Sequence, residues 1–536
     1  MERSEEQYRK LINDFKQSKP HLSQGAPFYQ NKEYDTGDIY KDICILGGGT
    51  AGYLTALALK KLFNIPVTLI ESSKIPPIGV GEATTPIIKG YLFDVLGLNV
   101  AEFYEKVKPT WKLGIKFEWG LPGEYFFNYP FDGKDVLSAI IHNNDINYCS
   151  LNSLMMSKDV GFISRVPNGE ETKHHSLSKS LKYAYHLDNK SLIRYLKEKA
   201  IEFGVNYIDD EIIDAVTTND GEEISYLVNK DYKKYEFDFF VDCTGFKSLL
   251  LDKKLKSKYV SYSSSLFNDT AVVSTVPHNG KIKPYTGAIT MNNGWCWNIP
   301  LRHEDHIGYV HCSEFCSLDE AHDEMKKKFP TMNKDVKQVK FRTGRHEEFI
   351  KGNVVAIGNS YAFIEPLEST GLHMIIDQII VLTNSFFNLK SNKRFRKELN
   401  SNMNAHWDYL RWFLSIHFKF NKKLDTKYWK ASREKINSSG FDPLVELYQE
   451  IGFLSRQDIP TTQLIRSRIK DTIFDVYGVD HLLLGLGLRP KNLSKIKLNN
   501  KKEWQGIVEN WENILKYSIP LQENVDLLVK HPTLVM

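Results

Sequence analysis

A cluster of glycines near the start of the sequence is the first group of residues whose types and spacing could do chemistry. Residues 47–52 read Gly-Gly-Gly-Thr-Ala-Gly, between the apolar run 43–46 and a second apolar segment. In a Gly-x-Gly-x-x-Gly turn that joins a strand to a helix, the first glycine permits the tight turn. The second lets the backbone approach a pyrophosphate, and the third lets the helix pack against the strand. Here these positions are Gly47, Gly49 and Gly52.

The residues that follow complete a nucleotide-binding unit. Thr50 and Ala51 open the helix, whose free N–H groups and partial positive charge attract phosphate. A second apolar run, residues 67–70, ends at Glu71, which lies 22 residues after Gly49. That is close to the spacing of about 20 residues expected for the acid that binds a ribose hydroxyl. The unit therefore predicts a dinucleotide cofactor.

Two later segments favour FAD over NAD as this cofactor. Each is an apolar strand that ends in a small-residue turn, at residues 239–245 and 354–360, and the second turn contains Gly358. They resemble the second and third flavin-contacting motifs of the flavoprotein monooxygenase fold, although Asn359 stands where an Asp is usual. The candidate cofactor contacts in a further glycine-rich loop, residues 79–86, are Gly81, Glu82 and Ala83.

Lys112 lies in a segment that alternates as a strand does, with successive side chains on opposite faces. One face would carry Trp111, Leu113, Ile115 and Phe117, and the other Lys112, Gly114, Lys116 and Glu118. This pattern by itself predicts a solvated lysine. It gives no reason to choose Lys112 over Lys116.

Glu368 and a pair of tryptophans are the other candidates, and each also has a purely structural interpretation. Glu368 precedes a long apolar helix, where an acid is stabilised by the helix dipole by less than about 1 kcal/mol. Trp295 and Trp297 are two residues apart, so in a strand they share a face and could simply pack in the core.

Taken together, these segments resemble the flavin-dependent tryptophan-halogenase family. The order and spacing agree from about residue 41 to 430. The segments that carry the resemblance are 43–52, 79–86, 111–117, 295–300 and 365–371, with 186–188 and 425–429 also similar.

The resemblance assigns catalytic roles. In the family, the lysine at the position of Lys112 meets hypohalous acid, and the carboxylate at Glu368 polarises the oxidant or takes the ring proton. Ser369 would orient Glu368. The halide would bind to the backbone N–H groups of Thr370 and Gly371, at the start of the helix, where anions bind readily.

The resemblance also implies cofactors and partners. Trp295, Trp297 and Pro300 would form a flavin-side gate that keeps the organic substrate from the flavin. Reduced FAD, dioxygen and a halide ion would produce hypohalous acid, which then reaches Lys112 through an internal channel. The sequence holds no second Gly-x-Gly-x-x-Gly unit. A separate flavin reductase would therefore supply the reduced FAD.

The resemblance weakens after about residue 440. Indole-selective members carry a segment there that binds the tryptophan amino-acid moiety, whereas this chain has a different stretch at 467–480, before similarity resumes at 484–490. The predicted substrate is an electron-rich aromatic molecule, indole-like or phenol-like, and free tryptophan is disfavoured. The alternatives are an aromatic hydroxylase on the same fold and a catalytically silent flavoprotein.

Size and composition agree with a cofactor enzyme. The 536 residues carry a net charge of only +4, which points to no nucleic acid and no anionic membrane as partner. Six cysteines in so long a chain predict no disulfide framework, and no metal site is expected. The start lacks a secretory signal, and no apolar run spans a bilayer. We expect a cytoplasmic enzyme that could be a homo-oligomer.

The predicted fold is α/β: a Rossmann-like FAD-binding fold of the flavoprotein-monooxygenase type, with an inserted β-sheet region and a mostly helical C-terminal region. We divide it into an N-terminal extension (1–40), a halogenase core (41–430) and a helical C-terminal substrate cap (431–536). Helices are expected at 189–203, 372–389 and 395–420.

Overall fold

The computed structural model describes residues 39–63, 65–75, 81–168, 171–278, 280–390, 392–455, 473–491 and 500–535. Nearly all of the predicted N-terminal extension lies outside these residues, as do residues 456–472 of the C-terminal region. Within the described residues, no helix is long and apolar enough to cross a membrane.

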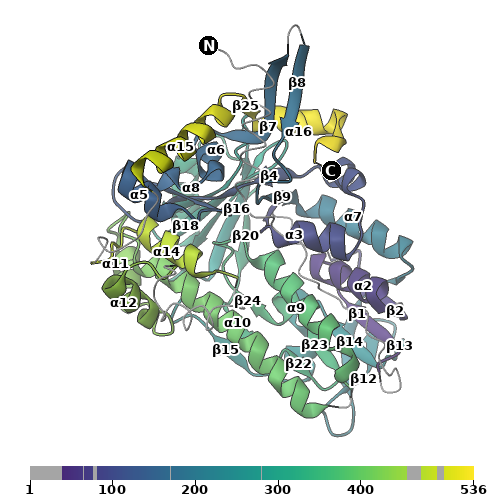
Figure 1. Ribbon diagram of the computed structural model, residues 1–536. Helices are drawn as coiled ribbons and strands as arrows, with labels where there is room; N and C mark the ends of the chain where they lie inside the picture. The colour runs from purple at the N-terminus through teal and green to yellow at the C-terminus, as the bar shows by residue number, and fades with distance from the viewer. Residues whose placement is uncertain are drawn as a thin grey trace.

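A six-stranded sheet forms the nucleotide-binding half of the molecule (Figure 1). Its order is β10-β2-β1-β14-β23-β22, parallel except for the last pair. The strands are β1 (Ile43–Leu46), β2 (Val67–Glu71), β10 (Asn206–Asp209), β14 (Phe239–Asp242), β22 (Ile350–Lys351) and β23 (Val354–Ala356). All four residues of β1 are buried, as expected for a parallel strand covered on both faces.

Helices cover one face of this sheet and a small sheet covers the other. The helices are α2 (Thr50–Phe63), α7 (Asn189–Glu202) and α9 (Gly371–Ser385), close to their predicted positions. Alternate residues of β1 face opposite sides. Ile43 and Ile45 join the main core, whereas Cys44 and Leu46 pack under the sheet β11-β12-β13. Those strands are β11 (Ile212–Thr217), β12 (Ile224–Asn229) and β13 (Lys234–Tyr235).

The predicted glycine turn joins β1 to α2, and its geometry requires glycine. Gly47 has φ +118°, and a Cβ there would lie 2.3 Å from the carbonyl oxygen of Cys243 at the end of β14. A Cβ on Gly52 would lie 1.9 Å from the carbonyl oxygen of Gly47, so only glycine lets the helix start this close to the turn. A Cβ on Gly49, in contrast, would meet nothing within 4 Å, which leaves this position open.

A seven-stranded sheet forms the other half, in the order β20-β16-β19-β18-β17-β5-β6. Its strands are β5 (Gly114–Glu118), β6 (Phe127–Pro130), β16 (Thr270–Val276), β17 (Thr286–Met291), β18 (Gly294–Pro300), β19 (Asp305–His311) and β20 (Lys337–Lys340). Helix α8 (Leu318–Lys328) packs on one face, against a cluster that includes Cys296. Trp295 and Trp297 face the main core on the opposite side, so the prediction that they share a face is confirmed.

A three-stranded sheet, β3-β9-β4, lies between these halves and corrects the predicted strand at Lys112. Strand β4 (Thr110–Lys112) ends at that lysine and pairs with β9 (Ala184–Asp188), which also pairs with β3 (Gly81–Ala83). The chain then changes sheets at Leu113. The Leu113 N–H donates to the Pro284 carbonyl (2.7 Å), and the Leu113 carbonyl accepts from the Phe131 N–H (3.0 Å). Because the strand is interrupted here, Lys112 and Lys116 do not share one solvated face.

The long helix α10 (Lys393–Lys419) runs across both halves (Figure 1). It begins near β22 and ends beside α11 (Lys427–Lys435). The other helices are α3 (Ile87–Lys89), α4 (Val100–Val107), α5 (Val136–Asn143), α6 (Leu151–Ser157), α12 (Asp442–Ile451), α14 (Val476–Gly485), α15 (Lys501–Leu515) and α16 (Leu521–Lys530). The remaining strands are β7 (Val160–Asn168), β8 (Glu171–Ser176), β15 (Tyr259–Ser261), β21 (Gly344–His346), β24 (Ala362–Phe363) and β25 (Ser518–Pro520).

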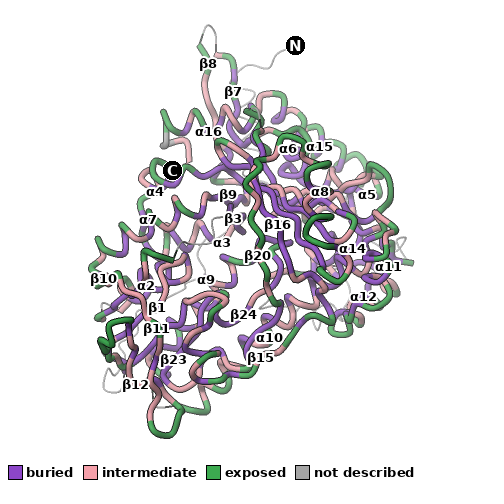
Figure 2. The backbone as a smooth tube through the Cα atoms, turned by 180° about the vertical axis from the view of Figure 1, so that it is seen from behind, coloured by how far each residue is buried: buried purple, intermediate pink, exposed green. Residues whose placement is uncertain are grey.

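The described part of the C-terminal region is mostly helical, as predicted, but it also adds a strand to the core. Strand β25 pairs with β7, the first strand of a hairpin that projects at the top of Figure 1. Burial is continuous across this junction, as the purple interior of Figure 2 shows, and residues of α14, α15 and α16 belong to the main hydrophobic core.

Asn524 holds this junction together and provides a test of it. The side chain is fully buried on α16. Its Oδ1 accepts from the Ile163 N–H of β7 (2.8 Å), and its Nδ2 donates to the carbonyls of Ile519 (2.9 Å) and Pro520 (2.8 Å). We predict that Asn524→Ala lowers the stability by about 3 kcal/mol, because three buried hydrogen bonds of about 1 kcal/mol each are lost.

Thermal unfolding followed by circular dichroism measures this effect, and limited proteolysis shows whether the C-terminal helices loosen first. Gln522→Ala is the matched control, because within the described residues the Gln522 amide hydrogen-bonds only to Asp526, one turn further along the same helix, at 3.2 Å. Equal melting temperatures for the two variants would contradict the prediction.

Candidate active site

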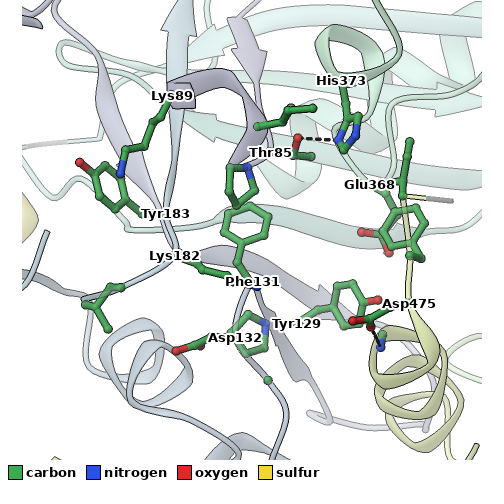
Figure 3. A pocket seen from close by; sticks show the side chains of 18 of the residues that line it. Thr85, Lys89, Tyr129, Phe131, Asp132, Lys182, Tyr183, Glu368, His373 and Asp475 are labelled. Atoms are coloured by element: carbon green, nitrogen blue, oxygen red, sulfur yellow. Dashed lines mark hydrogen bonds between the residues drawn. The ribbon is translucent and has the colours of Figure 1, made fainter. Parts of the chain in front are cut away.

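A large pocket opens where the two halves meet, and Glu368 lies in its wall (Figure 3). Its volume is about 910 Å³, within the range of roughly 300–1,000 Å³ typical of ligand sites. Its lining residues come from α3, β5, β6, α9 and α14 and from the loops beside them. In Figure 3, Lys89, Lys182 and Tyr183 lie at the end of the pocket away from Glu368.

Glu368 and the two residues after it form a strained, buried turn at the start of α9. Ser369 has φ +58°, which is rare for a residue with a side chain. Its Oγ and the Oγ1 of Thr370 are buried without a hydrogen-bond partner among the described residues. The first N–H groups of a helix are free to bind an anion, and here that helix begins at Gly371. Two unpaired hydroxyls beside free N–H groups are suited to hold a halide.

Lys112 is completely buried, which contradicts the solvated lysine that the alternation predicted. Its Nζ has no hydrogen-bond partner within the described chain and lies 5.4 Å from the ring centroid of Phe131, a pocket residue. Burial lowers the pKa of Lys112 to about 7, and the negative charge of Glu368 opposes this shift. The structure therefore brings Lys112 and Glu368, 256 residues apart in sequence, into one electrostatic site.

The structure also gives different environments to Lys112 and Lys116, the two lysines that the sequence pattern could not distinguish. Lys116 is only half-buried, and its Nζ lies over the rings of Phe126 (4.0 Å) and Tyr285 (5.4 Å). Lys112 instead has His186 of β9 as a neighbour. Burial and the nearby Lys112 charge together hold the pKa of His186 well below its usual range. The His186 ring stays neutral between the hydroxyls of Thr110 (3.3 Å) and Thr286 (2.9 Å).

Aromatic residues form the wall of the pocket near Glu368, and the sequence analysis did not single them out. Tyr129 and Phe131 follow β5 in the sequence, whereas Phe474 and Tyr477 come from the stretch before and within α14. That stretch is part of 467–480, where the family resemblance is weakest. No motif marks these positions, because a pocket wall assembled from separate elements leaves no local spacing in the sequence.

The predicted ribose-binding acid lies against the glycine turn. A Cβ on Gly48 would be 1.4 Å from Oε2 of Glu71, so this carboxylate oxygen faces the turn directly. The other oxygen, Oε1, accepts from the hydroxyls of Tyr53 (2.7 Å) and Tyr207 (3.0 Å) and from Nζ of Lys197 (2.9 Å). These three donors hold Glu71 in place with one oxygen left for a ligand.

The remaining predicted cofactor residues come together around the same end of the sheet. Gly358 has φ +71°, a Cβ there would lie 3.2 Å from Cβ of Ala51, and its N–H donates to Oε1 of Gln378 (2.7 Å). Nε2 of Gln378 and Oγ of Ser360 are buried polar atoms with no partner in the described ranges. Unpaired donors beside an open glycine turn fit a polar dinucleotide such as FAD.

The third glycine-rich loop reaches the same region through β3. Gly81 and Ala83 are buried in β3, which pairs with β9, so this loop and Lys112 are neighbours on two sides of one strand. Burial raises the pKa of Glu82 to about 7. Gly79, in the same loop, lies outside the described residues.

The tryptophan pair is connected to the Glu368 loop through Glu365. Nε1 of Trp295 donates to Oε2 of Glu365 (2.8 Å), and the rings of Trp295 and Trp297 are 6.0 Å apart. Pro300 ends the same strand, and its carbonyl accepts from the hydroxyl of Thr110 (2.6 Å), two residues before Lys112. These contacts connect strand β18 to the loop that carries Glu368 and to strand β4, which carries Lys112.

The six cysteines all fall in the described part of the chain, and all are buried and free. Among the described residues, no group of three or more His, Cys, Asp or Glu side chains is placed to hold a metal ion.

Comparison with known proteins identifies the family. A sequence model of the tryptophan halogenase family matches residues 42–500. The chain belongs to this family. The tryptophan 6-halogenase SttH of Streptomyces toxytricini is 33% identical over 425 residues, which are 73% of this chain and 81% of SttH. The tryptophan 7-halogenase RebH of Lentzea aerocolonigenes is 28% identical over 493 residues, 84% of this chain and 90% of RebH.

Solved halogenase structures share the fold over nearly the whole length. The crystal structure of MibH, a lanthipeptide tryptophan 5-halogenase, superposes with a TM-score of 0.86 and 38% identity, covering 94% of this chain and 96% of MibH. The chain is thus a flavin-dependent halogenase that uses FAD and a halide to halogenate an aromatic substrate. The predicted family, fold class and type of enzyme are confirmed.

The burial of Lys112 should lower the stability of the folded protein, and this effect can be measured. We predict that Lys112→Met raises the melting temperature, because the folded state no longer buries an amine that prefers to be charged. The pKa of Lys112 is about 7 when folded and 10.5 when unfolded. Between these values the unfolded chain binds more protons, so the stability of the wild type rises with pH. The gain from the substitution is therefore a few kcal/mol near pH 6 and smaller near pH 10, since one pKa unit corresponds to about 1.4 kcal/mol.

Melting temperatures at these two pH values, measured for the wild type and the variant, test the prediction. Lys116→Met is the matched control, because Lys116 is half-buried and keeps contact with solvent. If Lys112→Met proves less stable than the wild type near pH 6, the lysine is not buried as a poorly solvated cation.

Proposed function

We propose that Lys112 and Glu368 are the catalytic pair that transfers halogen from hypohalous acid to an aromatic ring in the large pocket. The observation that carries this proposal is a fully buried lysine with an unpaired Nζ, in electrostatic contact with a carboxylate in the pocket wall. A buried amine with a pKa near 7 exists in both protonation states at neutral pH, which suits proton transfer.

The proposed step balances in atoms and protons. The halogen–oxygen bond of hypohalous acid breaks as the carbon–halogen bond forms, and the Lys112 ammonium protonates the departing hydroxide to give water. Glu368 then takes the proton from the halogenated ring carbon. Transfer of this proton from Glu368 to the neutral Lys112 amine restores both groups. Because the site is buried, these groups act in a low-dielectric setting where charge stabilisation is strong.

The cofactor proposal assigns FAD to the glycine turn. The turn at Gly47, Gly49 and Gly52, with Thr50 and Ala51 at the helix start, would hold the pyrophosphate, and Oε2 of Glu71 a ribose hydroxyl. Gly358 and the β3 residues would hold the remainder. Reduced FAD with dioxygen supplies the oxidising equivalent that converts halide into hypohalous acid. We propose that a separate flavin reductase provides the reduced form.

The halide and the gate complete the assignment. The N–H groups of Thr370 and Gly371, with the unpaired Thr370 hydroxyl, would bind the halide. Ser369 would orient Glu368 through the strained backbone turn, since its hydroxyl makes no hydrogen bond among the described residues. Trp295, Trp297 and Pro300 would separate the cofactor from the organic substrate. Both tryptophan side chains are packed in the core. They would therefore exclude an aromatic ring from the path that a small oxidant would take between the two sites.

The substrate is proposed to be an indole carried by a molecule larger than free tryptophan, such as a peptide. Three observations support this. The pocket of about 910 Å³ extends well beyond Glu368, toward Lys89 and Tyr183. The similar protein MibH is a lanthipeptide tryptophan halogenase, and the identity with it is higher than with SttH. The stretch at 473–478, which lines the pocket, also departs from the family pattern for free tryptophan.

The test is mass spectrometry of candidate substrates incubated with the enzyme, FAD, a generic flavin reductase, NADH and chloride or bromide. The panel contains free tryptophan, tryptophan-containing peptides, simple indoles and phenols. We predict halogenated peptide as the main product. Lys112→Ala and Glu368→Gln should each lower its formation at least about 100-fold, the usual contribution of acid–base catalysis, while FAD still binds.

Lys116→Ala is the matched control and should keep activity near that of the wild type. Full activity of Lys112→Ala would overturn the role of that lysine. Products that gain oxygen instead of halogen would favour the hydroxylase alternative, and preferential halogenation of free tryptophan would overturn the proposed substrate.

A further inference from the structure

Glu368 has a buried partner that the halogenation step described above does not use. Nε2 of His417, on α10, lies 2.7 Å from Oε1 of Glu368, and both side chains are buried. The other ring nitrogen, Nδ1, lies 3.1 Å from the carbonyl oxygen of Phe413 in the preceding turn of the helix. Apolar rings surround the imidazole: those of Phe117 (5.6 Å) and Phe413 (5.2 Å) are near neighbours.

These contacts fix the number of protons in the pair. A carbonyl oxygen only accepts hydrogen bonds, so Nδ1 of His417 must carry a proton. In a neutral imidazole the other nitrogen, Nε2, would then be a bare lone pair. A lone pair 2.7 Å from an ionised carboxylate would be repelled, so one further proton lies between Nε2 and Oε1. The pair is either imidazolium with carboxylate or neutral imidazole with carboxylic acid.

The two helix ends decide between these forms. His417 lies in the last turn of the 27-residue helix α10, where the partial negative charge stabilises a cation. Glu368 precedes the first turn of α9, where the partial positive charge stabilises an anion. Imidazole is also the stronger base, with an unperturbed pKa near 6.5 against about 4.3 for Glu. Both effects place the proton on His417.

Glu365, three residues earlier in the same loop, is a buried carboxylate that lacks an imidazole partner and serves as a comparison. It is equally buried, but in the part of the chain that the structure describes its Oε2 accepts only from the neutral donors Trp295 Nε1 and Asn268 Nδ2, both at 2.8 Å. Burial raises the pKa of Glu365 to about 7, so neutral donors do not keep a buried carboxylate fully ionised near neutral pH. Glu368 is the one of the two that faces the pocket, and it is the one that has an imidazole partner.

We infer that His417 is a positioning residue for halogenation: as an imidazolium anchored to the Phe413 carbonyl, it keeps Glu368 ionised and holds Oε1 so that Oε2 is left to accept the ring proton. The inference rests on the proposed role of Glu368 as the base. Among the described residues, Lys112 on β4 and Tyr129 on β6 also interact with the Glu368 charge, and burial together with this charge holds the pKa of Tyr129 well above its usual range.

The pH dependence of turnover tests this inference. His417→Leu should lower kcat at least about 100-fold with KM for the substrate and FAD affinity little changed. His417→Gln keeps a neutral N–H donor for Oε1, so activity should recover as the pH rises. The acid limb of its kcat profile is expected to move to higher pH than in the wild type, because Oε1 then accepts from a neutral donor instead of an imidazolium. A purely structural role would lower kcat equally at all pH values.

His406→Gln is the matched control. His406 lies on the same helix α10 and also pairs with a carboxylate, since its Nδ1 is 2.8 Å from Oδ2 of Asp377. Its loss should leave the pH profile of halogenation as it is in the wild type.

Nitrogen-15 NMR of histidine-labelled protein reads the protonation state without turnover. The His417 resonance, assigned by its loss in His417→Gln, should show two protonated ring nitrogens at pH 7. In Glu368→Gln it should change to a neutral ring protonated only at Nδ1. A neutral imidazole in the wild type, or a kcat profile of His417→Gln that is only scaled down, would overturn the inference. If instead Glu368→Gln remains active, the base has been misassigned, whereas the NMR result still decides the state of the pair.

Discussion

The burial of ionisable groups without full compensation is the constraint on which the rest of the site depends. The Lys112 side chain is removed from water and its Nζ has no hydrogen-bond partner in the described chain, although Glu368 lies close enough to oppose the fall in its pKa. Such an arrangement costs stability, since a buried charge is favourable only when it is paired and hydrogen-bonded. The surrounding core must therefore be large and rigid enough to hold a lysine where it prefers to be neutral.

The architecture supplies that rigidity by bringing two sheets and two helix ends to one point. The chain passes from the small sheet to the large one at Leu113, directly after Lys112. The backbone is therefore held on both sides of the lysine side chain, by the pairing of β4 with β9 and by the two hydrogen bonds of Leu113. Helix α9 starts at the site and helix α10 ends there, and this opposite polarity surrounds Glu368 and His417 with complementary partial charges. Residues of the same two helices also belong to the main hydrophobic core, which extends to the strands of the nucleotide-binding sheet.

Much of the cofactor half could be predicted because its signals are local. The glycine turn, Glu71 and the buried strands are each defined by a few neighbouring residues, and the structure places them at one end of one sheet. The Lys112 strand was predicted wrongly because alternation presumes that one strand continues in one sheet. An interruption at a single residue, Leu113, reverses the conclusion about exposure, and nothing in the neighbouring side chains marks that interruption.

The sequence by itself therefore determined the family, the Rossmann-like fold and the identity of the residues proposed for catalysis, because these are carried by short motifs in a fixed order. Only the tertiary structure decided that Lys112 is buried and Lys116 is not, that His417 meets Glu368 across 49 residues, and that the divergent stretch at 473–478 lines the pocket. Burial, pairing and pocket shape arise from contacts between segments that are distant in the sequence. Such contacts produce no local pattern of residues from which they could be predicted.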